Sequence, residues 1–244
     1  KRLCSAIKTT VSKRESGESP RVEWTIEMAP STVKAEKLEM LKEMGVNRFS
    51  LGVQSFNPAT LEAIGRPHSL KQVEAAIALI KEAKIENWNI DLIFAASEAT
   101  LADWLRDLER AVNEAPKHIS TYCLTFESDT KMFLKMLRGL KRKPTPEEEA
   151  KFYEATWEFL EGREYKQYEV SNFAREGYGC SHNINTWRMG EWVGYGPSAA
   201  SQICLGDGHW KRFSNISDLG KWEAGVASGN FARVEEESLT AEGM

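Results

Sequence analysis

The first half of the chain alternates between two patterns of apolar residues. Four short apolar stretches have the length of buried strands: residues 22–28, 47–54, 88–94 and 118–126. Between them the apolar residues recur at helical spacing, and capping boxes that begin at Ser69 and Thr100 mark the start of two helices. Alternating strands and helices at this spacing predict right-handed βα units around a parallel sheet.

Four parallel strands are too few to close a barrel. The pattern therefore predicts either an open sheet or a barrel whose other strands would precede residue 22. We predict three segments: an N-terminal tail at 1–21, the βα region at 22–128 and a separate C-terminal region at 129–244.

The apolar pattern changes after residue 128. Residues 131–143 are basic with apolar residues between the charges, which is typical of a solvated amphipathic helix. A capping box at Thr145 predicts a longer helix that ends near Gly162. One strand is expected at 165–173 and a short helix near 218–224, whereas 174–209 show no helical period. These elements predict an α+β region.

Composition removes several classes of function. The chain has 244 residues, of which 41% are hydrophobic, so it can bury a core and is not globally disordered. A net charge of −4 argues against a nucleic-acid partner, and no apolar run approaches the ~20 residues of a membrane span. The chain opens at Lys1 without a Met or the apolar core of a signal peptide, and we expect its natural beginning to lie further upstream.

The cysteines are widely spaced along the chain. None of Cys4, Cys123, Cys180 and Cys204 lies within four residues of another, so no CxxC metal motif is present. We expect reduced thiols in a cytoplasmic protein, with Cys123 in the core and Cys180 in a polar loop.

Polar residues stand at the end of each predicted strand. These are Glu27, Gln54, Asp91 and Thr125, and Arg66 follows the second strand. In parallel α/β folds the carboxyl ends of the strands meet at one edge, where ligands bind, so we expect these side chains to converge. An arginine there suits a carboxylate, and acidic residues suit ribose hydroxyls or an ammonium group. The alternative is that Glu27 and Asp91 only cap helices or pair with Arg48 and Arg66.

The histidines allow two interpretations. His182 lies among Asn and Trp residues and could ligate a metal or haem, but composition alone favours a hydrogen-bonded loop histidine. We predict structural or surface positions for His68, His118 and His209.

Six segments together carry a resemblance to a known family. They are Ile26–Thr32, Asn47–Asn57, Gly65–His68, Asn89–Ile93, Gln167–Ala174 and His182–Trp187. In this order they resemble the oxygen-independent coproporphyrinogen III oxidase family of radical S-adenosylmethionine proteins. The last two segments resemble its haem-chaperone branch more closely, and the likeness runs from about residue 22 to the end.

The resemblance implies an α/β fold: a partial (βα)6 barrel, with four of six βα units, followed by the α+β C-terminal region. It implies that Glu27, Gln54, Arg66 and Asp91 bind S-adenosylmethionine. The arginine would hold the methionine carboxylate, and the acidic residues would hold the ribose or the amino group. His182 matches the family's His-Asn motif and becomes the candidate haem contact.

The chain departs from the family pattern in three places. The Cys-x3-Cys-x2-Cys loop that holds a [4Fe–4S] cluster is absent, as is the Gly-rich segment after the family's second strand. No metal ligand is therefore expected in this chain, and the cluster would require a longer N-terminus. Where the family has Tyr-Gly-Leu-Pro-Gly-Gln-Thr, this chain has Phe94–Thr100 with alanine in place of the first glycine. An alanine costs stability if the turn needs a positive φ. The family's Glu-Ala-Asn-Pro is also changed, to Glu27–Pro30 without the asparagine.

Three hypotheses of function follow from the resemblance. The favoured one is a haem chaperone that binds S-adenosylmethionine at the strand ends and haem through the C-terminal region, with a haem-acceptor protein as a further partner. The alternative is a coproporphyrinogen III oxidase that decarboxylates porphyrinogen propionates. The third is a degenerate member without cluster or activity, so whether this chain is an enzyme stays open.

Overall fold

The computed structural model describes residues 2–12, 22–96, 99–128, 130–206, 208–230 and 233–240. These residues form two compact units that divide between Gly179 and Cys180. The prediction that a family-specific C-terminal region begins at residue 129 is not tested by this division and stays a prediction. Compactness places residues 130–179 with the first unit, because part of that segment extends the first unit's sheet.

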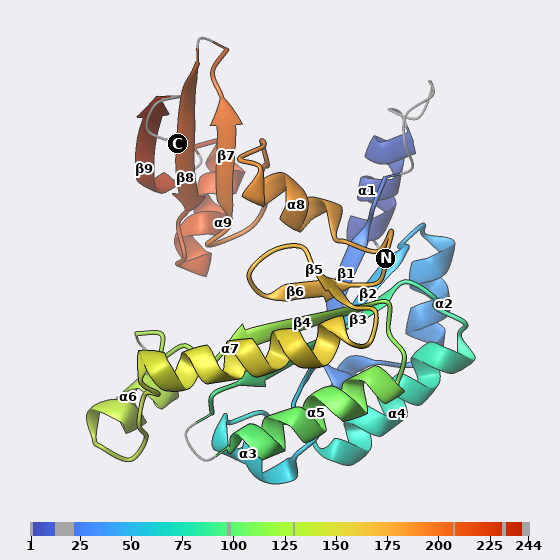
Figure 1. Ribbon diagram of the computed structural model, residues 1–244. Helices are drawn as coiled ribbons and strands as arrows, with labels where there is room; N and C mark the ends of the chain where they lie inside the picture. Colours follow the sequence, from blue (N-terminus) through green and yellow to red (C-terminus); the bar gives the residue numbers. More distant parts are fainter. Residues whose placement is uncertain are drawn as a thin grey trace. The chain divides into compact units, whose positions relative to one another are not determined.

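The first unit is built on a six-stranded sheet (Figure 1). In spatial order the strands are β1 (Thr25–Met28), β2 (Arg48–Gln54), β3 (Trp88–Phe94), β4 (His118–Cys123), β6 (Asn172–Ala174) and β5 (Lys166–Gln167). The first four strands are parallel neighbours, as the sequence predicts. Strands β6 and β5 continue the sheet in antiparallel orientation.

Helices connect the parallel strands and cover one face of the sheet (Figure 1). They are η1 (Pro30–Thr32), α2 (Ala35–Glu43), α3 (Pro58–Ala63), α4 (Leu70–Glu82), α5 (Leu101–Asn113) and α7 (Pro146–Glu161). Between β4 and α7 the short helix α6 (Lys131–Leu137) buries no residue. The predicted capping boxes at Ser69, Thr100 and Thr145 are all confirmed. Each cap satisfies backbone N–H groups that the first helical turn leaves without partners.

The two faces of the sheet differ in polarity because side chains alternate along a strand. Leu51, Ile90, Leu92 and Ile119 are fully buried on the face toward the helices. On that face Phe94 packs against Trp104 of α5 at a tilted angle and stacks with Phe152 of α7. The opposite face carries the polar residues of the strands, so the strands are not apolar on both faces.

Residues 165–173 do not form the single strand that the sequence predicts. They form a hairpin of β5 and β6, in which Tyr168 N–H donates to the Asn172 carbonyl at 3.1 Å. The turn forms because the Asn172 side chain bonds that of Glu169, and Asn172 N–H donates to the Glu169 carbonyl. The predicted N-terminal tail likewise contains a helix, α1 (Arg2–Ser12).

The second unit contains an antiparallel sheet of β7 (Ala200–Cys204), β8 (His209–Asn215) and β9 (Arg233–Thr240). Helix α9 (Leu219–Ser228) lies where a short helix is predicted. Helix α8 (Ser181–Trp187) lies in a stretch where no helix is expected. At seven residues, α8 is too short to give a clear apolar period.

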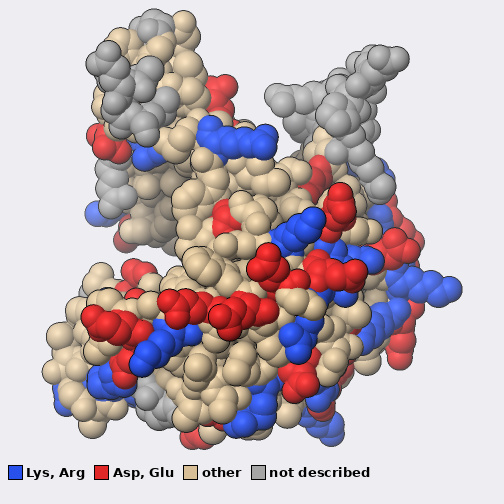
Figure 2. All heavy atoms as spheres, in the orientation of Figure 1, with Lys and Arg blue, Asp and Glu red and all other residues tan. Residues whose placement is uncertain are grey.

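Charges of both signs are mixed over the visible surface (Figure 2). Ion pairs form between some of the charged side chains, such as Lys81 with Glu114 at 2.6 Å and Arg175 with Glu164 at 2.9 Å. Within the described ranges, no helix has both the length and the apolarity needed to cross a membrane.

Candidate functional site

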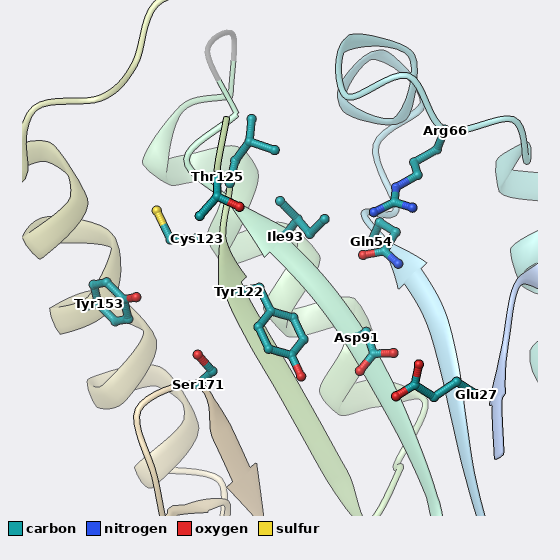
Figure 3. Close-up of a pocket in the computed structure, with 11 residues that line it drawn as sticks. Glu27, Gln54, Arg66, Asp91, Ile93, Tyr122, Cys123, Thr125, Tyr153 and Ser171 are labelled. Atoms are coloured by element: carbon teal, nitrogen blue, oxygen red, sulfur yellow. The ribbon is translucent and has the colours of Figure 1, made fainter. Parts of the chain in front are cut away.

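A cavity of about 630 Å³ lies at the carboxyl ends of the parallel strands (Figure 3). It is lined by Glu27, Gln54, Arg66, Asp91, Ile93, Tyr122, Cys123, Leu124, Thr125, Tyr153 and Ser171. The four polar residues that the sequence places at strand ends, and Arg66 after the second strand, are all in this set, so their predicted convergence is confirmed. An adjoining cavity of about 310 Å³ shares Glu27, Gln54, Arg66 and Asp91.

The charged part of the cavity brings both signs together. Figure 3 shows the Glu27 carboxylate beside that of Asp91, with Arg66 pointing toward Gln54. Among the described residues, neither Glu27 nor Arg66 has a hydrogen-bond or ion-pair partner for its side chain. Arg48 donates instead to the Tyr178 carbonyl at 2.9 Å and to Asn87. The alternative in which the two acids pair with Arg48 and Arg66 is therefore wrong for this structure.

Gln54 owes its orientation to an unusual backbone. It ends β2 with φ of 70°, in the left-handed region, and the pairing of β2 with β3 shifts register just before it. A non-glycine residue in this region costs free energy and persists only where the surroundings fix it, often at functional sites. Gly52 leaves the space that the Gln54 side chain uses, since a Cβ there would lie 2.8 Å from Gln54 Nε2.

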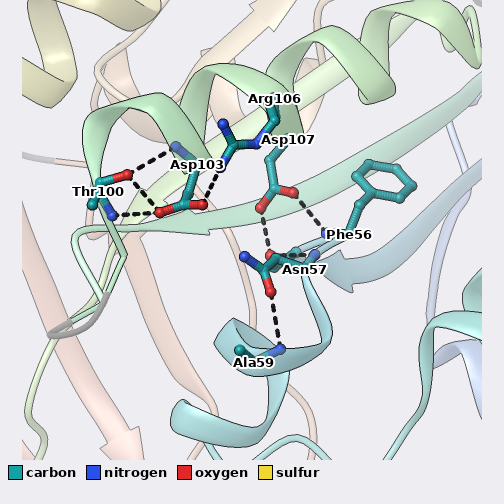
Figure 4. Close-up of polar contacts among 8 residues, drawn as sticks. Phe56, Asn57, Ala59, Thr100, Asp103, Arg106 and Asp107 are labelled. Atoms are coloured by element: carbon teal, nitrogen blue, oxygen red, sulfur yellow. Dashed lines mark hydrogen bonds and ion pairs between the residues drawn. The ribbon is translucent and has the colours of Figure 1, made fainter.

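Helix α5 holds the loop that follows Gln54 (Figure 4). The Asp107 carboxylate accepts from the Ser55 hydroxyl, and from Phe56 N–H at 2.9 Å. Asn57 then caps α3 by accepting from Ala59 N–H at 2.9 Å. These bonds fix the chain between Gln54 and Arg66. Burial raises the pKa of Asp107 to about 6.

Asp91 is held by one partner on the neighbouring strand β2 and by one partner on its own strand β3. Its Oδ2 accepts from the Ser50 hydroxyl at 3.0 Å, and its Oδ1 accepts from Asn89 Nδ2 at 2.6 Å. Burial raises the pKa of Asp91, the nearby Glu27 adds to this rise, and the bonds from Ser50 and Asn89 oppose it. The carboxylate is thus oriented by the protein but open to the cavity.

Sequence reasoning missed the polar residues deeper on the same face. Ser50, Asn89, His118 and Ser120 are all buried, and Asn89 is hydrogen-bonded to each of the other three. The signal was present, because polar residues recur at every second position, as in Asn89 and Asp91 or His118 and Ser120. His118 is buried here rather than on the surface.

Two tyrosines and a cysteine contribute to the remaining wall of the cavity. It contains Tyr122, Tyr153 and Cys123. Burial raises the pKa of Cys123 to about 11, so the thiol is protonated at neutral pH. Cys123 is half-buried at the cavity rather than fully in the core.

His182 belongs to the second unit, in the first turn of α8. Its side chain is exposed, and its carbonyl accepts from the Thr186 hydroxyl at 3.0 Å. Cys180, just before α8, is buried rather than in an open polar loop.

The residues of this chain do not fit an iron–sulfur cluster. Cys4, Cys123, Cys180 and Cys204 lie in separate elements. Across the part of the chain that the structure describes, no three His, Cys, Asp or Glu side chains form a metal-binding group. The expectation that this chain supplies no cluster ligands stays a prediction.

Two kinds of comparison relate the chain to known proteins. Residues 3–111 match the model of the radical SAM superfamily, so the match begins earlier than the predicted residue 22. The chain is 40% identical over 187 residues to "Heme chaperone HemW" of Synechocystis sp., covering 77% of this chain and 45% of that protein. It is 35% identical over 188 residues to the protein of the same name from Escherichia coli, covering 76% and 48%.

A vertebrate relative and a solved structure extend these matches. A mitochondrial "Radical S-adenosyl methionine domain-containing protein 1" of Danio rerio is 34% identical over 216 residues, covering 88% of this chain and 48% of that protein. The chain spans about half the length of the curated relatives it matches. The structure of coproporphyrinogen III oxidase (HemN) from Escherichia coli superposes with a TM-score of 0.72 at 22% identity, covering 96% of this chain and 56% of that chain. At this identity the likeness shows the fold alone.

Proposed function

From the premise that this chain belongs to the radical SAM superfamily, in the branch of the haem chaperones, we propose that it binds S-adenosylmethionine and haem and delivers haem to an acceptor protein. Glu27, Gln54, Arg66 and Asp91 would hold S-adenosylmethionine at the strand ends, and His182 would contact haem. The protein would act in the cytoplasm.

One observation carries the cofactor half of the proposal: four polar side chains from separate segments line the same cavity. S-adenosylmethionine has a carboxylate that suits the guanidinium of Arg66. Its ammonium and ribose hydroxyls suit the carboxylates of Glu27 and Asp91. The volume of about 630 Å³ is in the range of small-molecule sites.

The cofactor, once bound at a cluster, supplies radical chemistry in this superfamily. The described residues of this chain do not offer a three-cysteine group for that cluster. The proposal therefore concerns binding and orientation by the chain's own residues, and no reaction step is assigned to it.

Arg66→Ala tests the cofactor site. Titration calorimetry of S-adenosylmethionine into the full chain should show affinity about 10- to 100-fold weaker in the variant, because a charge-assisted pair is lost. Arg163→Ala is the matched control, since Arg163 lies beyond the end of α7 and contacts Phe159. Equal affinity of wild type and Arg66→Ala would contradict the assignment.

The haem half is supported by the names of the relatives and by the exposed imidazole of His182. Titration of haem into the wild-type chain should give a shifted Soret band, because an imidazole nitrogen is a common haem ligand. His182→Ala should weaken or abolish this shift, whereas His209→Ala, at another exposed histidine, should retain it. A wild-type chain that leaves the Soret band unchanged would remove the haem proposal.

A further inference from the structure

A chain of hydrogen-bonded side chains leads from the β5–β6 turn to Asp91. The hydroxyl of Tyr168 lies 2.7 Å from His118 Nε2, and His118 Nδ1 lies 2.7 Å from Asn89 Oδ1. Asn89 Nδ2 lies 2.6 Å from Asp91 Oδ1. Asn89 and His118 are 3% and 1% exposed, so water does not compete for these bonds. None of the three residues before Asp91 lines the cavity.

The donor and acceptor chemistry of these side chains allows only one direction for the series of hydrogen bonds. An ionised Asp91 only accepts, so Asn89 must present its Nδ2 to it and its Oδ1 to His118. An amide oxygen only accepts, so His118 carries its proton on Nδ1. Nε2 is then an acceptor, and the Tyr168 hydroxyl donates to it. Tyr168, His118 and Asn89 therefore each donate a hydrogen bond in the direction of Asp91.

The neutral form of His118 keeps this direction. Burial lowers the pKa of His118 well below its usual value, and the Arg48 cation adds to the effect. An imidazolium would donate from both nitrogens and could not accept from Tyr168. The neutral ring therefore has one favoured tautomer, fixed by its two partners.

The same bonds decide which way the Asn89 amide faces. If the amide rotated by half a turn, its oxygen would face the Asp91 carboxylate, and two acceptors would repel each other. Ser120 also donates to Asn89 Oδ1, at 3.3 Å, and Asn89 Nδ2 lies 2.6 Å from the Ser50 hydroxyl. The Nδ1–H of His118 is the nearer and stronger of the two donors to that oxygen.

We propose that His118 and Tyr168 are positioning residues of the cofactor cavity, acting through Asn89 to hold the Asp91 carboxylate ionised and facing the ligand. This inference rests on the proposed role of Asp91 in binding S-adenosylmethionine. It also gives a role to Tyr168, which does not line the cavity itself but lies in the same β5–β6 turn as Ser171, which does.

Two substitutions of His118 separate positioning from packing. In His118→Asn the amide nitrogen takes the place of Nδ1 and can still donate to Asn89. In His118→Gln the polar end reaches the place of Nε2, and the donor to Asn89 is lost. Calorimetry on the full chain should show S-adenosylmethionine affinity near wild type for His118→Asn and about tenfold weaker for His118→Gln. Equal affinities for the two variants would overturn the proposal.

A second measurement does not depend on the cofactor. The carboxyl ¹³C signal of Asp91, followed by NMR against pH, gives its titration midpoint. Loss of the oriented donor should raise this midpoint by about one pH unit in His118→Gln and leave it unchanged in His118→Asn. Identical midpoints would count against the proposal, even if the affinities differed.

The proposal can still be tested if wild type does not bind S-adenosylmethionine or if the His118 variants do not fold. If wild type does not bind S-adenosylmethionine, the proposed function fails, while the NMR midpoints still decide whether His118 positions Asp91. If the His118 variants do not fold, Tyr168→Phe removes only the hydroxyl that fixes the tautomer. It should weaken binding severalfold and raise the Asp91 midpoint, and wild-type values for both would overturn the proposal.

Discussion

At the scale of single residues, two left-handed backbone positions stand next to the cavity strands. Gln54 ends β2 with φ of 70°, and Ala95 follows β3 with φ of 61°. Gln54 directs its side chain into the cavity, so its strain has a use at the site. Ala95 is the position at which the resemblance places a glycine, and its positive φ is one that glycine adopts without strain. The neighbouring Ser97 and Glu98 lie outside the described residues.

Ala95→Gly is therefore expected to stabilise the protein. A left-handed alanine costs about 1–2 kcal/mol. The greater freedom of glycine in the unfolded chain and the loss of the buried Ala95 methyl offset most of this gain, which leaves about 0.5 kcal/mol or less. Urea unfolding measures the change. Ala96→Gly is the control, because Ala96 is buried without a positive φ and should lose stability. A loss of stability in Ala95→Gly as well would contradict the explanation.

At the scale of elements, the site depends on contacts between segments that are distant in sequence. Asp107 on α5 fixes the loop after β2, and Asn89 on β3 connects Asp91 with His118 on β4. The hairpin of β5 and β6 protects the edge of β4, with Ile119 paired to Phe173. The cavity is therefore held from several strands and from the helical layer behind them.

The buried carboxyl of Asp107 predicts a pH dependence of stability. Its pKa rises from 3.8 to about 6 on folding, so the folded state favours the protonated form. The contribution of the protonated Asp107 carboxyl to the free energy of unfolding is therefore full below pH 3.8 and is lost as the pH rises through 6.

Asp107→Asn tests this dependence. Between pH 5 and 7.5, wild type should lose about 1–1.5 kcal/mol of unfolding free energy relative to the variant, which cannot ionise at this position. Urea unfolding of both proteins across this range measures the difference. Parallel curves for the two proteins would show that Asp107 does not titrate there.

At the scale of the whole molecule, the two units differ in how much they bury. The main hydrophobic cluster contains residues between Met28 and Phe173, all in the first unit. Helix α4 buries four residues of thirteen, while α9, with ten residues, buries none. Elements with few buried contacts open at lower free energy than the core.

Hydrogen exchange should show this difference directly. Amides in α9 are expected to exchange roughly a hundredfold faster than those in α4, because local opening costs α9 less free energy. Mass spectrometry of the full chain, with peptides from both helices, makes the comparison within one sample. Equal protection of the two helices would mean that the second unit is as stable as the first.

Elements whose signals are local could be predicted from the amino-acid sequence. Strand β3 and the capping boxes of α4, α5 and α7 lie where the sequence predicts them. Apolar period and caps act within a few residues, so they are visible without the fold. The polar strand ends also followed from the sequence, because parallel strands must present their carboxyl ends at one edge.

Features that depend on residues distant in sequence become visible only in the folded protein. The hairpin at 166–174 forms against β4, and the chain of hydrogen bonds through Tyr168, His118, Asn89 and Asp91 joins three separate segments. The left-handed backbone of Gln54 is likewise fixed by its surroundings. Local sequence cannot specify such features, since their free energy comes from contacts that exist only after the strands have paired.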